Sequence, residues 1–197
     1  MASAYERRKE PAVVRRALLD CAASIAGKEG LVSVTVAGVS AAAGVTKGAL
    51  FHHFENKQAL VDAMFDELMA QLDAAVDAQI AADPVQRGCF TRAYVSTALT
   101  MDETTTGMWS VLISSLMGES QLAAKWHDWL AERLHRHAAT DTGSILDIVR
   151  MAADGAWLNC LTPQTASSTI DFQKIRMQLM AMTYEQEETG GTGSAVA

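Results

Sequence analysis

The chain of 197 residues is long enough to form one or two domains with hydrophobic cores, and 49% of its residues are hydrophobic. No apolar run approaches the roughly 18 residues that span a bilayer, no secretory signal is apparent, and the three cysteines are far apart, so we expect a cytoplasmic protein without a membrane partner. The net charge of −7 is unevenly spread, because residues 1–60 hold eight Lys/Arg against five Asp/Glu and residues 61–197 hold eight against eighteen. Contact with nucleic acid is therefore predicted only in the N-terminal part.

The first predicted helix follows a short polar segment. Residues 1–10 are expected to fray, and the helix is expected to begin near Pro11, because proline is favoured in a first helical turn. Gly30 is the predicted C-terminal cap. Apolar residues recur at helical spacing between these two points, at Val14, Leu18, Cys21, Ala22 and Ile25.

Two shorter helices are predicted next, over about 35–43 and 46–53. Thr35 and Thr46 are suitable N-caps for them, and Gly44 supplies the tight turn between them. The last helix is expected to turn its apolar side inward, at Leu50, Phe51 and Phe54. Its outward side has small residues and hydrogen-bond donors but no carboxylate, at Lys47, Gly48, Ala49, His52 and His53. Such a helix-turn-helix can place its last helix in a major groove.

The segment AGVTKGALFHHFENKQAL, residues 43–60, resembles the DNA-binding domain of the TetR family of bacterial transcriptional regulators. The family pattern is roughly AGVSxGxLYxHFxxKxxL. The sequence matches it at Ala43, Gly44, Val45, Gly48, Leu50, His53, Phe54, Lys57 and Leu60. Thr46 and Phe51 depart conservatively, and Phe51 lacks the phosphate-binding hydroxyl of the usual tyrosine. The resemblance implies a helix-turn-helix DNA-binding domain over residues 1–56.

The resemblance also implies which residues contact double-stranded DNA. Phosphate contacts are expected from the two capped helix starts and from two cationic or polar side chains, namely Thr35, Thr46, His53 and Lys57. Base contacts are expected from the outward side of the third helix, where Gly48 also lies, and the candidates are Lys47, Ala49 and His52. A lysine can donate to guanine and an alanine can touch a thymine methyl group. A homodimer would read a pseudo-palindromic operator with recognition helices about 34–36 Å apart.

The rest of the chain is also predicted to be helical, which makes an all-α protein of about nine helices. A long helix is expected from near Lys57 to about Ala81, and Asp83 with Pro84 is read as the N-cap and first turn of the next helix, about 84–101. Further helices are expected over about 104–117, 119–139, 144–162 and 168–187. Residues 57–188 are assigned to one ligand-binding and dimerisation domain, and the Gly-rich residues 189–197 to a disordered tail.

The family resemblance implies that this second domain dimerises and binds a small-molecule effector. Pairing of the last two helices with a partner subunit would use Ile148, Ala152, Ala156, Trp157, Ile175, Leu179 and Met182, although packing within one chain would use small residues of this kind equally well. Methionine and aromatic residues are candidates for the pocket wall, and also for ordinary core: Met64, Phe65, Phe90, Tyr94, Met108, Trp109, Leu112, Trp126 and Met151. Their character favours an apolar or aromatic effector.

Catalytic and metal-binding patterns are not found in the sequence. It contains no HExxH, CxxC, GxSxG or P-loop motif, and His135 and His137 are two apart on a predicted helix and point to different faces. We therefore predict no enzyme activity, cofactor or metal site. The predicted function is a ligand-responsive transcriptional regulator, most simply a repressor released by its effector. Two alternatives are a helical ligand-binding or scaffold protein without sequence-specific DNA binding, and a helical-bundle enzyme.

Overall fold

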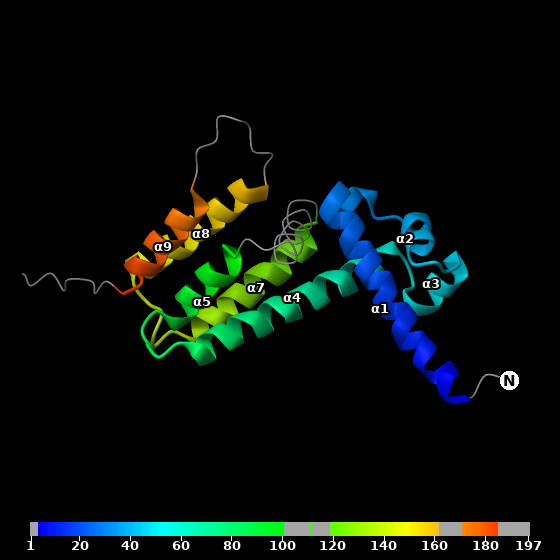
Figure 1. Ribbon diagram of the computed structural model, residues 1–197, viewed down its shortest axis with the longest axis horizontal. Helices are drawn as coiled ribbons and strands as arrows, with labels where there is room; N and C mark the ends of the chain where they lie inside the picture. The colour runs from blue at the N-terminus through cyan, green and yellow to red at the C-terminus, as the bar shows by residue number, and fades with distance from the viewer. Residues whose placement is uncertain (1–3, 101–110, 112–118, 162–170, 185–197) are drawn as a thin grey trace, which may run out of the picture. The chain divides into compact units, whose positions relative to one another are not determined.

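The computed structural model describes residues 4–100, 111, 119–161 and 171–184 (Figure 1). In these residues there are eight α-helices, one 3-10 turn and no strand, which confirms the all-α prediction. The predicted helix over 104–117 lies outside the described residues, except for Val111, which is helical and buried. The chain divides into two compact units, residues 1–75 with 100–132 and residues 76–99 with 133–197. No helix in the described ranges is long and apolar enough to cross a membrane.

The first unit begins with three helices and a turn packed around one small core. The elements are α1 (Ala4–Glu29), η1 (Leu31–Ser33), α2 (Val36–Ala42) and α3 (Lys47–His53), and α1 contacts the other three. Fully or almost fully buried apolar side chains form the core: Leu18, Leu19, Ala22, Ala26, Leu31, Val34, Val39, Leu50 and Phe54. The two short helices lie beside α1 in Figure 1. This core fixes the position of α3.

The start of α1 differs from the prediction. The helix begins at Ala4 and passes through Pro11, so the expectation that residues 1–10 fray is wrong for residues 4–10. The segment before the proline is rich in Glu, Arg, Lys and Ala, which are strong helix formers. The missing N–H of Pro11 removes only one bond of the helical ladder, and the strong helix formers before it extend the helix.

Two long helices, α4 (Lys57–Ala82) and α7 (Ser120–Arg136), run side by side and contribute residues to both units (Figure 1). In the first unit, Lys125 Nζ lies 2.6 Å from Asp66 Oδ1 and Trp129 Nε1 donates to Asp73 Oδ1 at 2.6 Å. Residue numbers rise together along the two helices, so α4 and α7 are parallel. The buried apolar residues of α4 in this unit recur at helical spacing, at Leu60, Val61, Met64, Phe65, Leu68 and Leu72.

The second unit is built around α5 (Cys89–Ala98), which is buried on every side. It packs against α8 (Ser144–Leu161) and α9 (Phe172–Met182), as Figure 1 shows. The helix contains buried polar residues that are all hydrogen-bonded, among them Arg92, which donates to Asp83 Oδ2 at 2.6 Å and to Thr183 Oγ1 at 3.4 Å. The Arg92 guanidinium also lies 4.5 Å from the centre of the Tyr184 ring. Arg92 thus ties the segment after α4 to the end of α9.

The predicted start of α5 at Asp83 and Pro84 is wrong. Asp83 closes a turn instead, because its Oδ1 accepts from the backbone N–H of Val85 at 2.9 Å and its Oδ2 accepts from Arg92. Burial alone would raise the pKa of Asp83, but the hydrogen bonds from Arg92 and Val85 and the Arg92 charge outweigh burial and lower the pKa. The carboxylate of Asp83, which was predicted to cap the helix, therefore forms an ion pair with Arg92.

The N-terminus of α5 is capped by a residue from a distant segment. Asp141, in the turn between α7 and α8, accepts from the backbone N–H of Thr91 at 2.7 Å and of Phe90 at 3.3 Å. The residue before the helix, Gly88, has a φ of +74°, and a Cβ there would lie 2.9 Å from Nη1 of Arg92. The helix begins at Cys89 because Gly88 allows this backbone and Asp141 pairs its free N–H groups.

The other boundaries are close to the predictions. The helix expected over 119–139 ends at Arg136, and the one expected over 168–187 is described over Phe172–Met182, where Asp171 caps it by accepting from the N–H of Lys174 at 3.0 Å. The predicted tail, residues 189–197, lies outside the described residues.

Candidate nucleic-acid interface

Two threonines cap the short helices of the first unit as the sequence predicted. Thr35 Oγ1 accepts from the N–H of Gly38 at 3.0 Å, and Thr46 Oγ1 accepts from the N–H of Ala49 at 3.1 Å. Gly44 lies between the helices with a φ of +68°, a conformation that favours glycine. These local contacts set where α2 ends and α3 begins, and they leave the other N–H groups at the start of each helix for an external anion.

The outward face of α3 is cationic or polar and contains no acidic residue. Lys47, Gly48 and His52 are exposed, and Ala49 and His53 are half-buried. Leu50 faces the core and is 0% exposed. The sequence prediction for the outward face therefore agrees with the side-chain positions, while contact of this face with DNA stays a prediction.

Phe51 is on the other side of α3 from the one that the sequence analysis chose. Its side chain is 50% exposed, although it was expected in the core beside Leu50 and Phe54. Leu50 and Phe54 are four residues apart and share a face, whereas Phe51 is rotated by about 100° from Leu50. An exposed aromatic ring therefore joins the outward face of the helix, which the hydrophobicity of Phe51 alone could not reveal.

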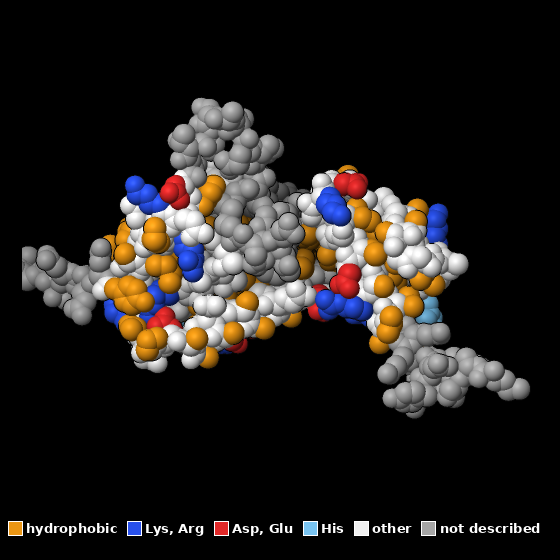
Figure 2. All heavy atoms as spheres, in the orientation of Figure 1, with side chains coloured by type: hydrophobic (Ala, Val, Ile, Leu, Met, Phe, Trp, Pro, Cys, Tyr) orange, Lys and Arg blue, Asp and Glu red, His pale blue; other side chains and the backbone are white. Residues whose placement is uncertain are grey.

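Three aromatic rings contact one another at the end of α3. The His52 and His53 rings are 5.4 Å apart in an edge-to-face arrangement, and His53 lies 6.5 Å from Phe54. The guanidinium of Arg15, on α1, lies 5.2 Å from the centre of the Phe54 ring. Figure 2 shows histidine at the surface of this unit, in pale blue. The contacts orient His53 relative to α1 and α3.

Lys57 is the first residue of α4, four residues after the last residue of α3. Asn56 Oδ1 accepts from the N–H of Ala59 at 2.9 Å and so caps α4. The side chain of Lys57 is exposed. A cation beside free backbone N–H groups is a favourable place for a phosphate.

Two family descriptions match the chain, and together they cover most of it. Residues 18–64 match "Bacterial regulatory proteins, tetR family", and residues 88–184 match "Tetracyclin repressor-like, C-terminal domain". The chain belongs to the TetR family of bacterial transcriptional regulators. The expectation from the sequence motif is thereby confirmed.

Curated TetR-family relatives match only part of their own length. The chain is 44% identical over 48 residues to the HTH-type transcriptional repressor KstR2 of Rhodococcus jostii, which is 24% of each protein. It is 38% identical over 85 residues to the HTH-type transcriptional regulator TtgR of Pseudomonas putida, or 42% of this chain and 40% of TtgR. The match thus spans less than half of each relative.

Solved structures share the fold over nearly the whole chain. A transcriptional regulator from Rhodococcus has a TM-score of 0.67 at 19% identity, covering 88% of this chain and 93% of its own. The multidrug binding protein EbrR, solved with malachite green, has a TM-score of 0.64 at 20% identity, covering 85% and 96%. At these identities the likeness shows the fold of a TetR-family protein.

Of the residues predicted to line the effector pocket of this TetR-family protein, five are buried, one is exposed and three lie outside the described residues. Met64, Phe65 and Trp126 are buried in the first unit, and Phe90 and Tyr94 are buried in the second. Met151 is 73% exposed on α8, which contradicts its assignment to the wall of an interior pocket. Its helix turns the positions of Val149 and Arg150 inward instead. The remaining candidates, Met108, Trp109 and Leu112, lie outside the described residues.

A buried polar pair, which the sequence did not predict, accompanies the aromatic residues of the second unit. The Tyr94 hydroxyl donates to Asp154 Oδ1, and the Tyr94 ring lies 6.0 Å from that of Phe90. Burial raises the pKa of Asp154 despite the hydrogen bond from Tyr94 and the charge of Arg150. Burial, with the Asp154 charge and hydrogen bond, raises the pKa of Tyr94 well above its usual value.

The predicted dimer residues on α8 divide between the surface and the core. Ile148 is 52% exposed, and Ala152 is exposed one turn later. Ala156 and Trp157 are buried inside the chain, at 9% and 7% exposed. A partner subunit could cover little of their surface, so their assignment to the dimer interface is wrong. The exposed stripe of α8 is apolar and runs through Ile148, Met151, Ala152, Gly155 and Leu158.

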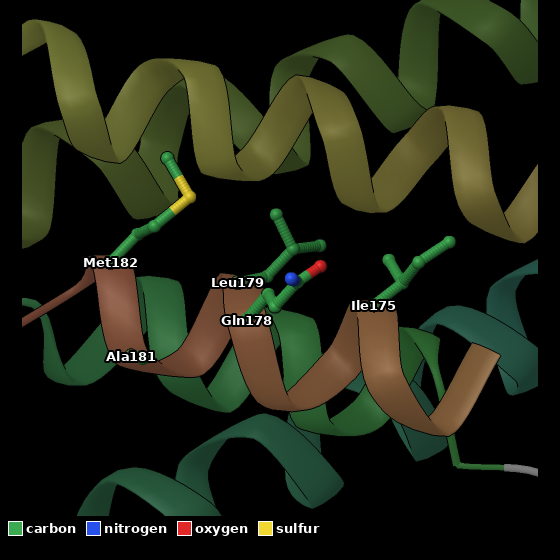
Figure 3. A pocket seen from close by; sticks show the side chains of 5 residues that line it. All are labelled: Ile175, Gln178, Leu179, Ala181 and Met182. Atoms are coloured by element: carbon green, nitrogen blue, oxygen red, sulfur yellow. The ribbon is translucent and has the colours of Figure 1, made fainter. Parts of the chain in front are cut away.

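The predicted dimer residues on α9 line a shallow open groove of about 480 Å³ (Figure 3). Ile175 and Met182 are half-buried there, Leu179 is only 6% exposed, and Gln178 and Ala181 complete the lining. In Figure 3 the side chains of Ile175, Leu179 and Met182 point to the side of α9 where α8 lies. Leu179 therefore belongs mainly to the chain's own core, and Ile175 and Met182 remain accessible.

Proposed function

We propose that this TetR-family protein is a ligand-responsive transcriptional repressor that binds a pseudo-palindromic operator as a homodimer in the cytoplasm. The observation that carries the proposal is the outward face of α3, which a capped helix-turn-helix holds in place and which presents Lys47 and His52 with no carboxylate. That face suits a polyanion.

Different residues contribute to affinity and to specificity in this proposal. Lys57, with the capped starts of α2 and α3 at Thr35 and Thr46, would contact phosphates and set the register on the duplex. Lys47 and His52, exposed on α3, would reach base edges, and the small residues Gly48 and Ala49 would let the helix approach closely. The number of cations is small, so much of the affinity would come from two half-sites bound together.

Dimerisation is supported by the exposed apolar surface of α8 and α9. The stripe of α8 that includes Ile148 and Met151 would be exposed to water in a lone chain, and the α9 groove beside Ile175 and Met182 is also apolar. Burial of such surface is worth about 25 cal/mol per Å². A two-fold dimer through these helices would cover the surface and set the separation of the two copies of α3.

The effector is proposed to be apolar or aromatic, and the buried pair of Tyr94 and Asp154 would supply its polar contacts. EbrR, which shares the fold, was solved with malachite green, a precedent for an aromatic ligand in this architecture. To release DNA, the effector must bind more tightly to the conformation that does not bind DNA, and a coupling free energy of about 1–3 kcal/mol is typical.

The test is a mobility shift with the full chain and the DNA that flanks its own gene, at a series of salt concentrations. We expect Lys57→Ala to weaken binding to all sequences and to lower the salt slope by about one, because one phosphate contact is lost. Lys47→Ala is expected to relax sequence preference, with a loss of about 1–3 kcal/mol on the preferred site. Lys174→Ala, which removes an exposed lysine of α9, is the matched control and should bind like the wild type.

The alternative function, a helical ligand-binding or scaffold protein, predicts a different pattern. Binding without sequence preference, or equal effects of the Lys47, Lys57 and Lys174 variants, would favour that alternative. A preferred operator found in this way would then serve to screen aromatic compounds for release.

A further inference from the structure

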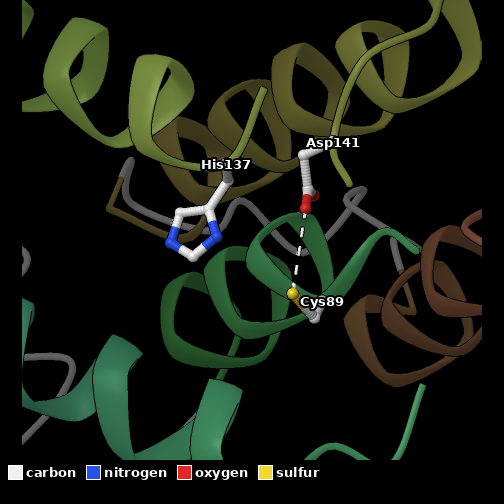
Figure 4. A group of neighbouring side chains, drawn as sticks. All are labelled: Cys89, His137 and Asp141. Atoms are coloured by element: carbon white, nitrogen blue, oxygen red, sulfur yellow. Dashed lines mark hydrogen bonds between the residues drawn. The ribbon is translucent and has the colours of Figure 1, made fainter. Parts of the chain in front are cut away.

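Three side chains of metal-ligating type meet at one end of the second unit (Figure 4). Cys89 is the first residue of α5, His137 directly follows α7, and Asp141 lies in the turn before α8. One sulfur, nitrogen or oxygen atom from each lies within 4.8 Å of the other two, and Cys89 Sγ is 3.9 Å from Asp141 Oδ2. His137 and Asp141 are four residues apart, but Cys89 is distant from both in the sequence, and the sequence prediction expected no metal site.

The imidazole of His137 is held by stacking. Its ring lies parallel to that of Phe90, with centroids 5.3 Å apart and planes at 7°, and its Nε2 is buried without a hydrogen-bond partner. Figure 4 shows that the ring nitrogen turned toward Cys89 and Asp141 is Nδ1, the one bonded to the ring carbon that carries the side chain, and that Nε2 lies on the far side of the ring. The stacking contact with Phe90 sets the orientation of the ring, and in this orientation Nδ1 is the nitrogen that can serve as a ligand in the cluster.

The Asp141 carboxylate is oriented by neighbouring donors. It accepts from the backbone N–H groups of Phe90 and Thr91 and from the Thr140 hydroxyl, the last at 2.9 Å. Oδ2 accepts from both Phe90 and Thr140, whereas Oδ1 accepts only from Thr91, so the lone pair left for one more ligand is on Oδ1. Hydrogen bonds of this kind fix the orientation of metal-ligating carboxylates.

The same three residue types could also suggest a cysteine nucleophile, but the environment of Cys89 argues against that role. Its side chain is only 4% exposed, and burial together with the Asp141 charge raises the pKa of its thiol. A nucleophilic cysteine needs a lowered pKa and access to substrate. A divalent ion, in contrast, would take the place of the thiol proton.

We propose that Cys89, His137 and Asp141 bind a divalent transition-metal ion of the zinc or cobalt class, with water in the fourth position. Sulfur, imidazole and carboxylate together suit such an ion better than they suit Mg²⁺ or Ca²⁺. Bonds of about 2.0–2.3 Å place tetrahedral ligand atoms about 3.3–3.8 Å apart, so the cluster closes by about 1 Å on binding. The ion would link the start of α5 to the turn between α7 and α8. The site is independent of the DNA-binding function proposed above.

The test is titration of the chelator-treated full chain with Co²⁺, followed by absorbance. A bound thiolate gives a near-ultraviolet sulfur-to-cobalt charge-transfer band, and tetrahedral Co²⁺ gives intense visible bands. We expect one equivalent with both signals in the wild type. Cys89→Ser should lose the charge-transfer band, and His137→Gln should weaken binding tenfold or more. Cys21→Ser and His135→Gln, which alter a half-buried cysteine of α1 and an exposed histidine of α7, are the matched controls and should titrate like the wild type.

The proposal is overturned if the wild type shows no charge-transfer band, or if the band survives in folded Cys89→Ser. A band lost in Cys21→Ser would also overturn it, because the thiolate would then belong to another site. Thermal melting with Zn²⁺ is the second measurement and keeps the test decisive if one variant folds poorly. Zn²⁺ should raise the melting temperature of the wild type and of both controls, and should raise that of His137→Gln less at the same Zn²⁺ concentration. An equal rise in His137→Gln would contradict the proposal.

Discussion

Replacement of Asp141 by alanine tests whether this one carboxylate determines where α5 begins. The Asp141 carboxylate accepts hydrogen bonds from the backbone N–H groups of Phe90 and Thr91. Both residues are 0% exposed, so water cannot easily replace the carboxylate as their acceptor. Each unpaired buried donor costs about 1–3 kcal/mol, and loss of a negative charge at a helix N-terminus adds up to about 1 kcal/mol. We therefore expect Asp141→Ala to lower the free energy of unfolding by about 3–5 kcal/mol. Asp141→Asn, which keeps one carbonyl acceptor, should lower it by about 1–2 kcal/mol.

The assay is urea unfolding of the full chain, followed by far-ultraviolet circular dichroism in the presence of a chelator so that no metal ion contributes. Asp128→Ala removes an exposed carboxylate of α7 and is the matched control, with an expected change within about 0.5 kcal/mol. If Asp141→Ala were no less stable than Asp128→Ala, a helix cap supplied by Asp141 would be refuted.

Three further predictions concern the other parts of the chain. Thr46→Ala should lower the free energy of unfolding by about 1 kcal/mol and weaken DNA binding. Thr46→Ser should keep both stability and DNA binding, because serine still offers an acceptor for the N–H of Ala49. Equal behaviour of the two variants would contradict this. Because the pKa of Asp154 is raised in the folded state, its contribution to stability is present below the usual carboxyl pKa of 3.8 and is lost as pH rises through the folded-state value. Asp154→Asn should remove that loss in urea unfolding between pH 3 and 8, and an unchanged pH profile would count against it. Ile148→Asp should shift the chain from dimer to monomer in sedimentation velocity, and Val32→Asp, at a residue that is 89% exposed on η1, should not.

The helix-turn-helix was predictable because its determinants act within a few residues. Thr35 and Thr46 cap helices that begin at the next residue, and Gly44 takes the left-handed conformation on which the turn depends. The side of α3 to which Phe51 belongs was not predictable from its hydrophobicity, because exposure depends on how α1 and α3 pack.

The start of α5 and the cluster beside it could not be read from the sequence. Asp83 and Pro84 have the local pattern of a helix start, but Arg92 takes the carboxylate of Asp83 in an ion pair. The cap comes from Asp141, and only tertiary structure brings that residue to Phe90 and Cys89. The buried pair of Tyr94 and Asp154 was missed for the same reason, since its two helices meet only in the folded chain.

The most direct test of the proposed function is selection of binding sites by the full-length protein from a pool of random duplex DNA. The account predicts enrichment of a two-fold symmetric sequence with half-sites centred about 10–10.5 base pairs, or a multiple of that, apart. With Lys47→Ala, the selected sequences should lose their base preference at the operator position that Lys47 contacts. Recovery of no preferred sequence, or of a single half-site without symmetry, would contradict a dimeric operator-binding repressor.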